Sequence, residues 1–285
     1  MKKGINIWSF GDGATIESAI ATAKKAGFDG IELSLNETGE LSLQSTDKEL
    51  AEIKARLEDA ELELAGLATG LYWEYAMTSE DAAKRSKAVD VCKKQLETAA
   101  ALGVDAILVI PGAVGVDFIP DSEVVSYDVA YDRALEAIGS LVPYAAQAGV
   151  AIAIENVWNK FLLSPLELRG FIDSHDSAYV GSYFDVGNTV HNGYPEQWIR
   201  ILGNRIKKVH FKDYRRQAGG LHGFVDLLAG DVDYPAVMDA LQSIGYDNYV
   251  TAEMIPPYTH HGEQIIYNTS AAMDAILGKG RKTHA

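Results

Sequence analysis

A short phrase that recurs along the chain limits its possible folds more than any other feature. A helical pattern ends in small residues and glycine, an apolar residue follows, and a strand pattern begins almost at once. The phrase reads AGFDGIEL at residues 26–33, LGVDAILV at 102–109, IGYDNYV at 244–250 and, more weakly, AGVAIAIE at 148–155. Glycine just past the last helical turn supplies a left-handed cap, so each copy predicts a short helix-to-strand connection.

The spacing of these copies predicts the number of strand–helix units. At roughly 35 residues per unit, the intervals between Gly27, Gly103, Gly149 and Gly245 hold about two, one and two to three units. The whole chain then holds about eight. Strict alternation of strands and helices predicts a parallel sheet. Eight units in 285 residues favour closure into a (β/α)8 TIM barrel over an open doubly wound sheet. No GxGxxG motif follows any strand, which further weakens the open-sheet alternative.

The hydrophobic pattern places the individual elements. We expect strands at residues 3–8, 30–35, 63–67, 106–110, 150–155, 179–185, 206–211 and 249–253. We expect helices at residues 15–26, 46–60, 79–102, 127–148, 165–174, 196–202, 234–244 and 263–277. No linker or low-complexity segment divides the chain, so we expect one domain over residues 1–285.

Four of the predicted strands end in a residue that can bind a metal ion. These residues are Glu155, which follows an apolar run, and Asp185, His210 and Glu253, which follow strand-like runs. Alone, Asp185 could be a helix N-cap, and His210 could be a hydrogen-bonded core residue. In a barrel, however, the carboxyl ends of all strands meet at one face. A buried carboxylate there must be solvated, paired or bound to a cation, so the four together favour a metal site.

The types of these side chains select the ion and the chemistry. Three carboxylates with one imidazole suit Mn²⁺, our first expectation, or Mg²⁺, Co²⁺ or catalytic Zn²⁺, and the lack of thiolates excludes a structural zinc site. Glu155 and Glu253 would lie on either side of the ion. That arrangement suits removal of a proton from carbon on one face and its return on the other, through an enediolate that the metal stabilises.

The four strand ends also resemble those of a known family. IEN at 154–156, FDVGN at 184–188, VHFKD at 209–213 and AEM at 252–254 look like the xylose-isomerase-like TIM-barrel superfamily of sugar isomerases and epimerases. The resemblance is greatest to the ketose 3-epimerases for tagatose and allulose and to the pentulose-phosphate 3-epimerases. It extends to GFDGIEL, with Glu32, and to GDVDY at 230–234. It implies an isomerase in which the four side chains bind a divalent metal, with Glu155 and Glu253 as the proton-transfer pair, in a homodimer or homotetramer.

The resemblance also implies substrate contacts. Arg216, or the adjacent Arg215, would contact substrate hydroxyls. Asn188 stands where the epimerases of free ketoses have histidine, which favours the sugar-phosphate branch and makes Asn188 the substrate contact.

Other side chains are candidates from their positions alone. Trp8 and Trp158 lie at or just beyond strand ends and could form a wall of a sugar pocket, or could simply pack. Lys212 is a possible phosphate partner, as are Lys160 and the two arginines.

The leading interpretation is thus an epimerase acting at C3 of a ketose or ketose phosphate. An aldose–ketose isomerase and a dehydratase of oxo-sugars or oxo-inositols remain alternatives on the same scaffold. The net charge of −15, from 25 basic and 40 acidic residues, argues against a nucleic-acid or membrane partner and against a DNA endonuclease. One cysteine, Cys92, excludes an intramolecular disulfide. Without a signal peptide or membrane-spanning run, we expect a cytoplasmic protein.

Overall fold

The computed structural model describes residues 1–11, 13–255 and 258–279. Within these residues, eight parallel strands close into a barrel in the order β1-β10-β7-β6-β5-β4-β3-β2. The strands are β1 (Lys2–Asn6), β2 (Gly30–Ser34), β3 (Glu63–Ala68), β4 (Ala106–Val109), β5 (Ala151–Glu155), β6 (Val180–Asp185), β7 (Ile206–Phe211) and β10 (Tyr249–Ala252). The predicted (β/α)8 TIM barrel is therefore confirmed.

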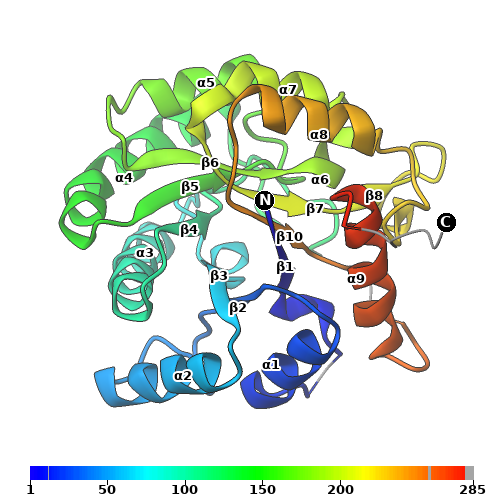
Figure 1. Ribbon diagram of the computed structural model, residues 1–285. Coiled ribbons are helices and arrows are strands. Elements are labelled where there is room, and N and C mark those ends of the chain that lie inside the picture. Colours follow the sequence, from blue (N-terminus) through cyan, green and yellow to red (C-terminus); the bar gives the residue numbers. More distant parts are fainter. Residues whose placement is uncertain (12, 256–257, 280–285) are drawn as a thin grey trace, which may run out of the picture.

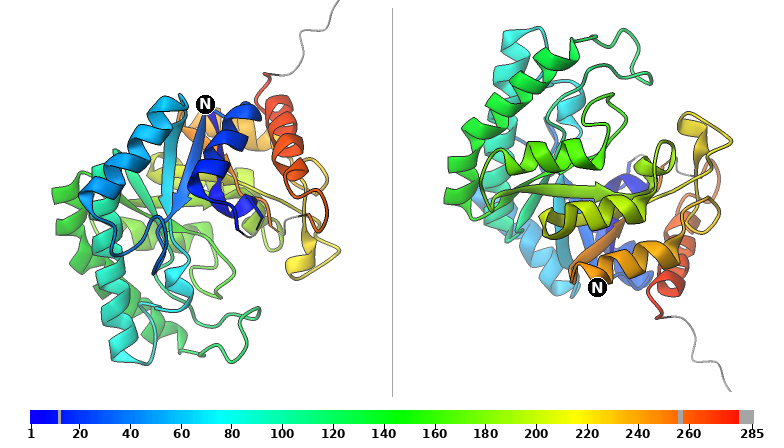
Figure 2. Two further views of the ribbon diagram at one scale, coloured as in Figure 1. Left: turned by 90° about the horizontal axis from the view of Figure 1, so that it is seen from below. Right: turned by 90° about the horizontal axis from the view of Figure 1, so that it is seen from above.

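One principal helix follows each barrel strand and packs outside it (Figure 1, Figure 2). These helices are α1 (Ile16–Lys25), α2 (Asp47–Asp59), α3 (Ala82–Leu102), α4 (Tyr127–Ala148), α5 (Pro165–Asp173), α7 (Pro195–Leu202), α8 (Tyr234–Ser243) and α9 (Gln264–Ile276). Each predicted strand and helix is present, with ends within about three residues of the expected positions. Among the described residues, none of the helices has both the length and the hydropathy that crossing a bilayer requires.

The glycines of the recurring phrase have the backbone conformation that was expected of them. Gly27, Gly103, Gly149 and Gly245 have φ values of 81°, 82°, 68° and 71°. A side chain is disfavoured in this left-handed region, whereas glycine enters it freely. Each glycine therefore ends its helix and lets the next strand begin within a few residues.

A short helix and a two-stranded hairpin were not among the predicted elements. A short helix α6 (Val186–Val190) follows β6 directly, and β8 (Asp213–Tyr214) pairs with β9 (Phe224–Val225) in an antiparallel hairpin beyond β7. Both lie where barrel strands end, next to the predicted metal ligands.

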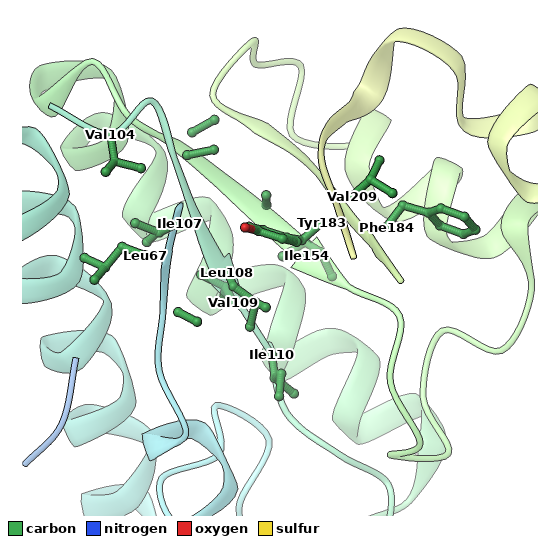
Figure 3. Packing of buried hydrophobic residues seen from close by; sticks show 14 of the residues in the cluster. Leu67, Val104, Ile107, Leu108, Val109, Ile110, Ile154, Tyr183, Phe184 and Val209 are labelled. Atoms are coloured by element: carbon green, nitrogen blue, oxygen red, sulfur yellow. The ribbon is translucent and has the colours of Figure 1, made fainter. Parts of the chain in front are cut away.

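The core extends over both faces of the barrel strands. Apolar side chains of neighbouring strands, such as Ile107, Ile154 and Val209, are buried together with the inner faces of the helices (Figure 3). A strand covered on both faces needs no polar alternation, which explains the continuous apolar runs in the sequence.

Candidate metal centre

The four predicted ligands meet at the carboxyl ends of their strands. Glu155 ends β5, Asp185 ends β6, His210 lies near the end of β7, and Glu253 follows β10. One ligand atom from each side chain lies within 4.8 Å of the corresponding atoms of the other three, and all four residues are buried. The register explains the meeting, because Asp185 is level with His210 on the neighbouring strand.

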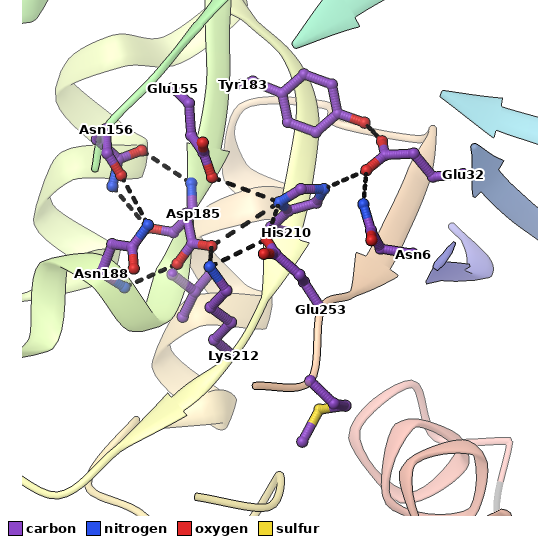
Figure 4. Close-up of polar contacts among 12 residues, drawn as sticks. Asn6, Glu32, Glu155, Asn156, Tyr183, Asp185, Asn188, His210, Lys212 and Glu253 are labelled. Carbon is purple, nitrogen blue, oxygen red and sulfur yellow. Dashed lines mark hydrogen bonds and ion pairs between the residues drawn. The ribbon is translucent and has the colours of Figure 1, made fainter. Parts of the chain in front are cut away.

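The side chains point toward a common centre (Figure 4). Nδ1 of His210 lies 2.9 Å from Oε2 of Glu253, 3.6 Å from Oε1 of Glu155 and 3.9 Å from Oδ2 of Asp185. Three of these buried atoms, His210 Nδ1, Asp185 Oδ2 and Glu253 Oε2, form no hydrogen bond. Both oxygens lie close to the ammonium of Lys212, at 3.2 and 3.0 Å, and buried polar atoms without a hydrogen bond are rare. Three that face one another, with oxygen and imidazole donors, fit a divalent cation.

His210 is held in place by a carboxylate from the other side of the barrel. Its Nε2 lies 2.8 Å from Oε1 of Glu32 on β2, a strand that is not a neighbour of β7. Glu32 also accepts hydrogen bonds from Asn6 and from the hydroxyl of Tyr183. With Nε2 protonated toward Glu32, Nδ1 keeps the lone pair that a metal needs. These contacts cross the barrel interior, so no local sequence signal predicts them, although Glu32 belongs to the recurring phrase.

Asp185 is both a helix cap and a candidate ligand. Its Oδ1 accepts a hydrogen bond of 2.7 Å from the backbone N–H of Asn188 and so caps α6. The Asn156 side chain bonds the backbone of Asp185 at both its N–H and its carbonyl, each at 2.8 Å. The two interpretations of Asp185 are therefore compatible, since the cap uses Oδ1 and leaves Oδ2 facing the centre.

Lys212 lies among the carboxylates. Its Nζ is 3.2 Å from Oδ2 of Asp185 and 3.0 Å from Oε2 of Glu253, and the side chain is 8% exposed.

Burial raises the pKa of Glu155 to about 7, against the lowering effect of His210 and Lys212. Burial would also raise the pKa of Glu253, but Lys212 and His210 together lower it to about 2. The pKa values of the two glutamates are therefore shifted in opposite directions, because Lys212 forms an ion pair with Glu253.

The other candidate contacts lie around this centre. The buried Asn188 donates from its side chain to the carbonyl of Asn156 at 3.0 Å. Trp158 donates to the carbonyl of Asn188 at 3.0 Å, and its ring packs against Tyr214 and Phe224. Both thus lie near the candidate metal ligands, with their polar groups already bonded to the backbone.

The structure does not bring the remaining candidates to the four ligands. Arg215 and Arg216 are exposed, and their Nε atoms donate to the carbonyls of Ala229 and Val190. The Arg216 guanidinium also lies 5.2 Å from the centre of the Tyr194 ring. Trp8 lies in the turn after β1, beside a cavity between the loops that follow β1 and β2.

Comparison with known proteins supports the fold and identifies the family. The model of the family described as "xylose isomerase-like TIM barrel" matches residues 20–275. The putative L-ribulose-5-phosphate 3-epimerase SgbU of Escherichia coli K12 is 25% identical over 251 residues, which is 82% of each chain. The L-ribulose-5-phosphate 3-epimerase UlaE of E. coli is 23% identical over 81% of this chain and 79% of its own.

Solved structures with the same fold include ketose epimerases. A D-psicose 3-epimerase from Clostridium cellulolyticum H10, solved with D-tagatose, superposes with a TM-score of 0.79 at 19% identity and covers 98% of this chain and 99% of its own. An L-ribulose 3-epimerase has a TM-score of 0.79 at 21% identity, covering 98% and 95%. Because the family model matches most of the chain, the protein belongs to the xylose isomerase-like TIM barrel family.

Proposed function

We propose that this protein is a divalent-metal-dependent epimerase that inverts C3 of a ketose or ketose phosphate. The observation that carries the proposal is the buried cluster of three carboxylates and one imidazole, with its two glutamates at the ends of different strands. The substrate class is supported by the names of similar proteins, which are 3-epimerases of L-ribulose 5-phosphate, L-ribulose and D-psicose.

The proposed metal ligands are Glu155, Asp185, His210 and Glu253. The bound ion would be Mn²⁺, with Mg²⁺, Co²⁺ or Zn²⁺ as alternatives. When bound, it would polarise the ketose carbonyl and the adjacent hydroxyl and so stabilise an enediolate. Glu32 holds the imidazole so that Nδ1 faces the site.

The two glutamates then carry the proton. One, as the carboxylate, takes the proton from C3; the C–H electron pair forms the C2–C3 double bond, and the carbonyl pair moves onto the C2 oxygen. The other, as the carboxylic acid, returns a proton to the opposite face of C3 while the carbonyl re-forms. Atoms and charge balance, and the glutamates exchange protonation states. The epimer that enters decides which of Glu155 and Glu253 acts first.

The proposed substrate contacts are Asn188, Arg216, Arg215, Trp8, Lys212 and Trp158. Of these, Asn188, Trp158 and Lys212 are supported by their proximity to the ligands. We further propose that residues 1–285 act as one domain, in a cytoplasmic homodimer or homotetramer.

Incubation of the metal-loaded enzyme with a panel of ketoses and ketose phosphates in deuterated water tests the proposal. Epimerisation predicts deuterium at C3 of both epimers. Label confined to C1 or C2 would instead indicate an aldose–ketose isomerase. A product that has lost one water would indicate a dehydratase. Metal analysis of the purified protein in parallel identifies the ion.

A further inference from the structure

The side chain of Lys212 brings a positive charge into the candidate metal centre. Among the described residues, Lys212 is the only lysine or arginine that forms an ion pair with any of the candidate ligand carboxylates, and it pairs with two of them, Asp185 and Glu253. It directly follows β7, two residues after His210, and its side chain is almost fully buried. A buried ammonium is retained only where anions compensate for its lost hydration, and here the compensating anions are two proposed metal ligands.

The ammonium binds the same oxygen atoms that face the metal position. Oδ1 of Asp185 is occupied by the N–H of Asn188, so Oδ2 remains for a metal, and Lys212 Nζ lies 3.2 Å from Oδ2. Oε2 of Glu253 lies 2.9 Å from His210 Nδ1 and 3.0 Å from Lys212 Nζ. A divalent ion on these two oxygens would be repelled by an ammonium at the same place.

The stem of Lys212 packs against α6, and its ammonium lies beside an aromatic ring. A Cβ at Gly187 would lie 2.4 Å from Cβ of Lys212, so the stem packs tightly against α6 and only glycine fits there. The Nζ atom lies 5.6 Å from the centre of the Phe224 ring. An aromatic face attracts a cation at such distances. Displacement of the ammonium would therefore involve the outer part of the side chain, next to the Phe224 ring.

We propose that Lys212 is an internal counter-cation: it neutralises the ligand cluster before a metal ion binds, and the metal must displace it. The consequence is a centre that is stable without metal and binds metal less tightly than its ligands alone would. Once displaced, the ammonium is free to contact a substrate oxygen. This inference rests on the metal binding in the proposed function, but on no particular sugar or reaction.

Metal affinity tests the inference independently of turnover. Mn²⁺ dissociation constants are measured by competition with a fluorescent chelator for metal-stripped wild-type protein, Lys212→Met and Lys208→Met. Lys208 is a matched control, because it is also a buried lysine, four residues earlier on β7, and it pairs with Asp105 at 2.7 Å instead of with the candidate ligands. We expect Lys212→Met to bind Mn²⁺ at least about tenfold more tightly, since the repulsion is removed, and Lys208→Met to bind like the wild type.

Thermal stability provides a second readout. Without metal, Lys212→Met should have a lower Tm than the wild type, because the carboxylates lose their counter-charge. Mn²⁺ should raise the Tm of this variant by more than it raises the Tm of the wild type. If Lys212→Met does not fold without metal, Lys212→Gln is measured in its place, with the same expectation of tighter binding. If Lys212 only supported the candidate ligands, replacing it would leave the Mn²⁺ affinity unchanged or weaken it. That result would overturn this inference but not the proposed metal dependence. A wild-type protein that binds no Mn²⁺ overturns both the inference and the proposed metal dependence.

Discussion

At the scale of single residues, Glu155 and Glu253 are the side chains on which the proposed chemistry depends. Replacing either by glutamine keeps its size but removes a group that can gain and lose a proton. We expect Glu155→Gln and Glu253→Gln each to lower kcat at least about a thousandfold, with a circular dichroism spectrum like that of the wild type. Glu136→Gln, an exposed change on α4, serves as the control. Near-normal turnover in either site variant would rule out the two-glutamate mechanism.

Glu32 is a positioning residue that acts through His210. Glu32→Gln removes the charge that fixes the imidazole with Nε2 protonated. Changes of this kind typically weaken metal binding by about 10- to 100-fold, and we expect that range for Mn²⁺, measured by chelator competition. Glu63→Gln is the matched control, because Glu63 begins the neighbouring strand β3 and pairs with Lys2 instead. Equal Mn²⁺ affinities in the two variants would show that His210 needs no support from Glu32.

At the scale of elements, Asp213 organises the segment between β7 and α8. Its two carboxylate oxygens accept four backbone hydrogen bonds, from Tyr214, Leu228, Gly230 and Val232. Asp213→Asn would turn an NH₂ group toward backbone donors, and leaving buried donors unpaired costs about 1–3 kcal/mol. We expect faster hydrogen exchange over residues 214–232, measured by mass spectrometry. Asp231→Asn is the control, since Asp231 accepts from the backbone of Arg216. Unchanged exchange in Asp213→Asn would mean that the segment is held by other contacts.

His175, just after α5, links stability to pH. Its ring packs edge-on against Phe171, its buried Nε2 has no hydrogen-bond partner, and burial lowers the pKa of His175. The unfolded chain therefore binds this proton more readily than the folded protein, and stability is lost as the pH falls through about 6.5, the pKa of an unperturbed histidine. In urea unfolding between pH 7.5 and 5.5, His175→Leu should lose less stability than the wild type. Equal losses would show that His175 is protonated without cost in the folded state.

The regular elements could be predicted because their signals are local. Helix caps, left-handed glycines and apolar strands lie within a few residues of one another, as in AGFDGIEL at residues 26–33. Helix α6 and the β8–β9 hairpin are too short for a periodic pattern, so neither was among the predicted elements. The one signal for α6 was the possible N-cap at Asp185, which the structure confirms.

The candidate site was predictable only in part, for a similar reason. A closed barrel brings strand ends together whatever the side chains are, so the meeting of Glu155, Asp185, His210 and Glu253 follows from topology. The partners of these residues follow from side-chain packing across the barrel. Glu32 reaches His210 from the far side, and Lys212, expected as a phosphate partner, turns inward to the carboxylates. Nothing local in the sequence encodes either contact.

At the scale of the whole molecule, the site joins four strands that are adjacent in the barrel but distant along the chain. The candidate ligands come from β5, β6, β7 and the end of β10, and together they span about a third of the sequence. A cation bound to all four side chains would therefore cross-link the ends of these four adjacent strands. Since the unfolded chain has no such site, the free energy of binding adds to the free energy of unfolding.

Metal removal should consequently destabilise the entire barrel. At a free Mn²⁺ concentration one hundred times the dissociation constant, the added stability is about 2.7 kcal/mol, which for a chain of this size corresponds to a few degrees in Tm. We expect EDTA followed by dialysis to lower the Tm in differential scanning calorimetry, and Mn²⁺ to restore it. In Asp185→Asn, which keeps an acceptor for the cap of α6 but removes the charge, Mn²⁺ should give a much smaller rise. Because the net charge of −15 lets any divalent ion bind weakly at the surface, Ca²⁺ added to the wild type is the second control. If Mn²⁺ raised the Tm of Asp185→Asn as much as that of the wild type, the stabilising ion would have to bind outside the four-residue cluster.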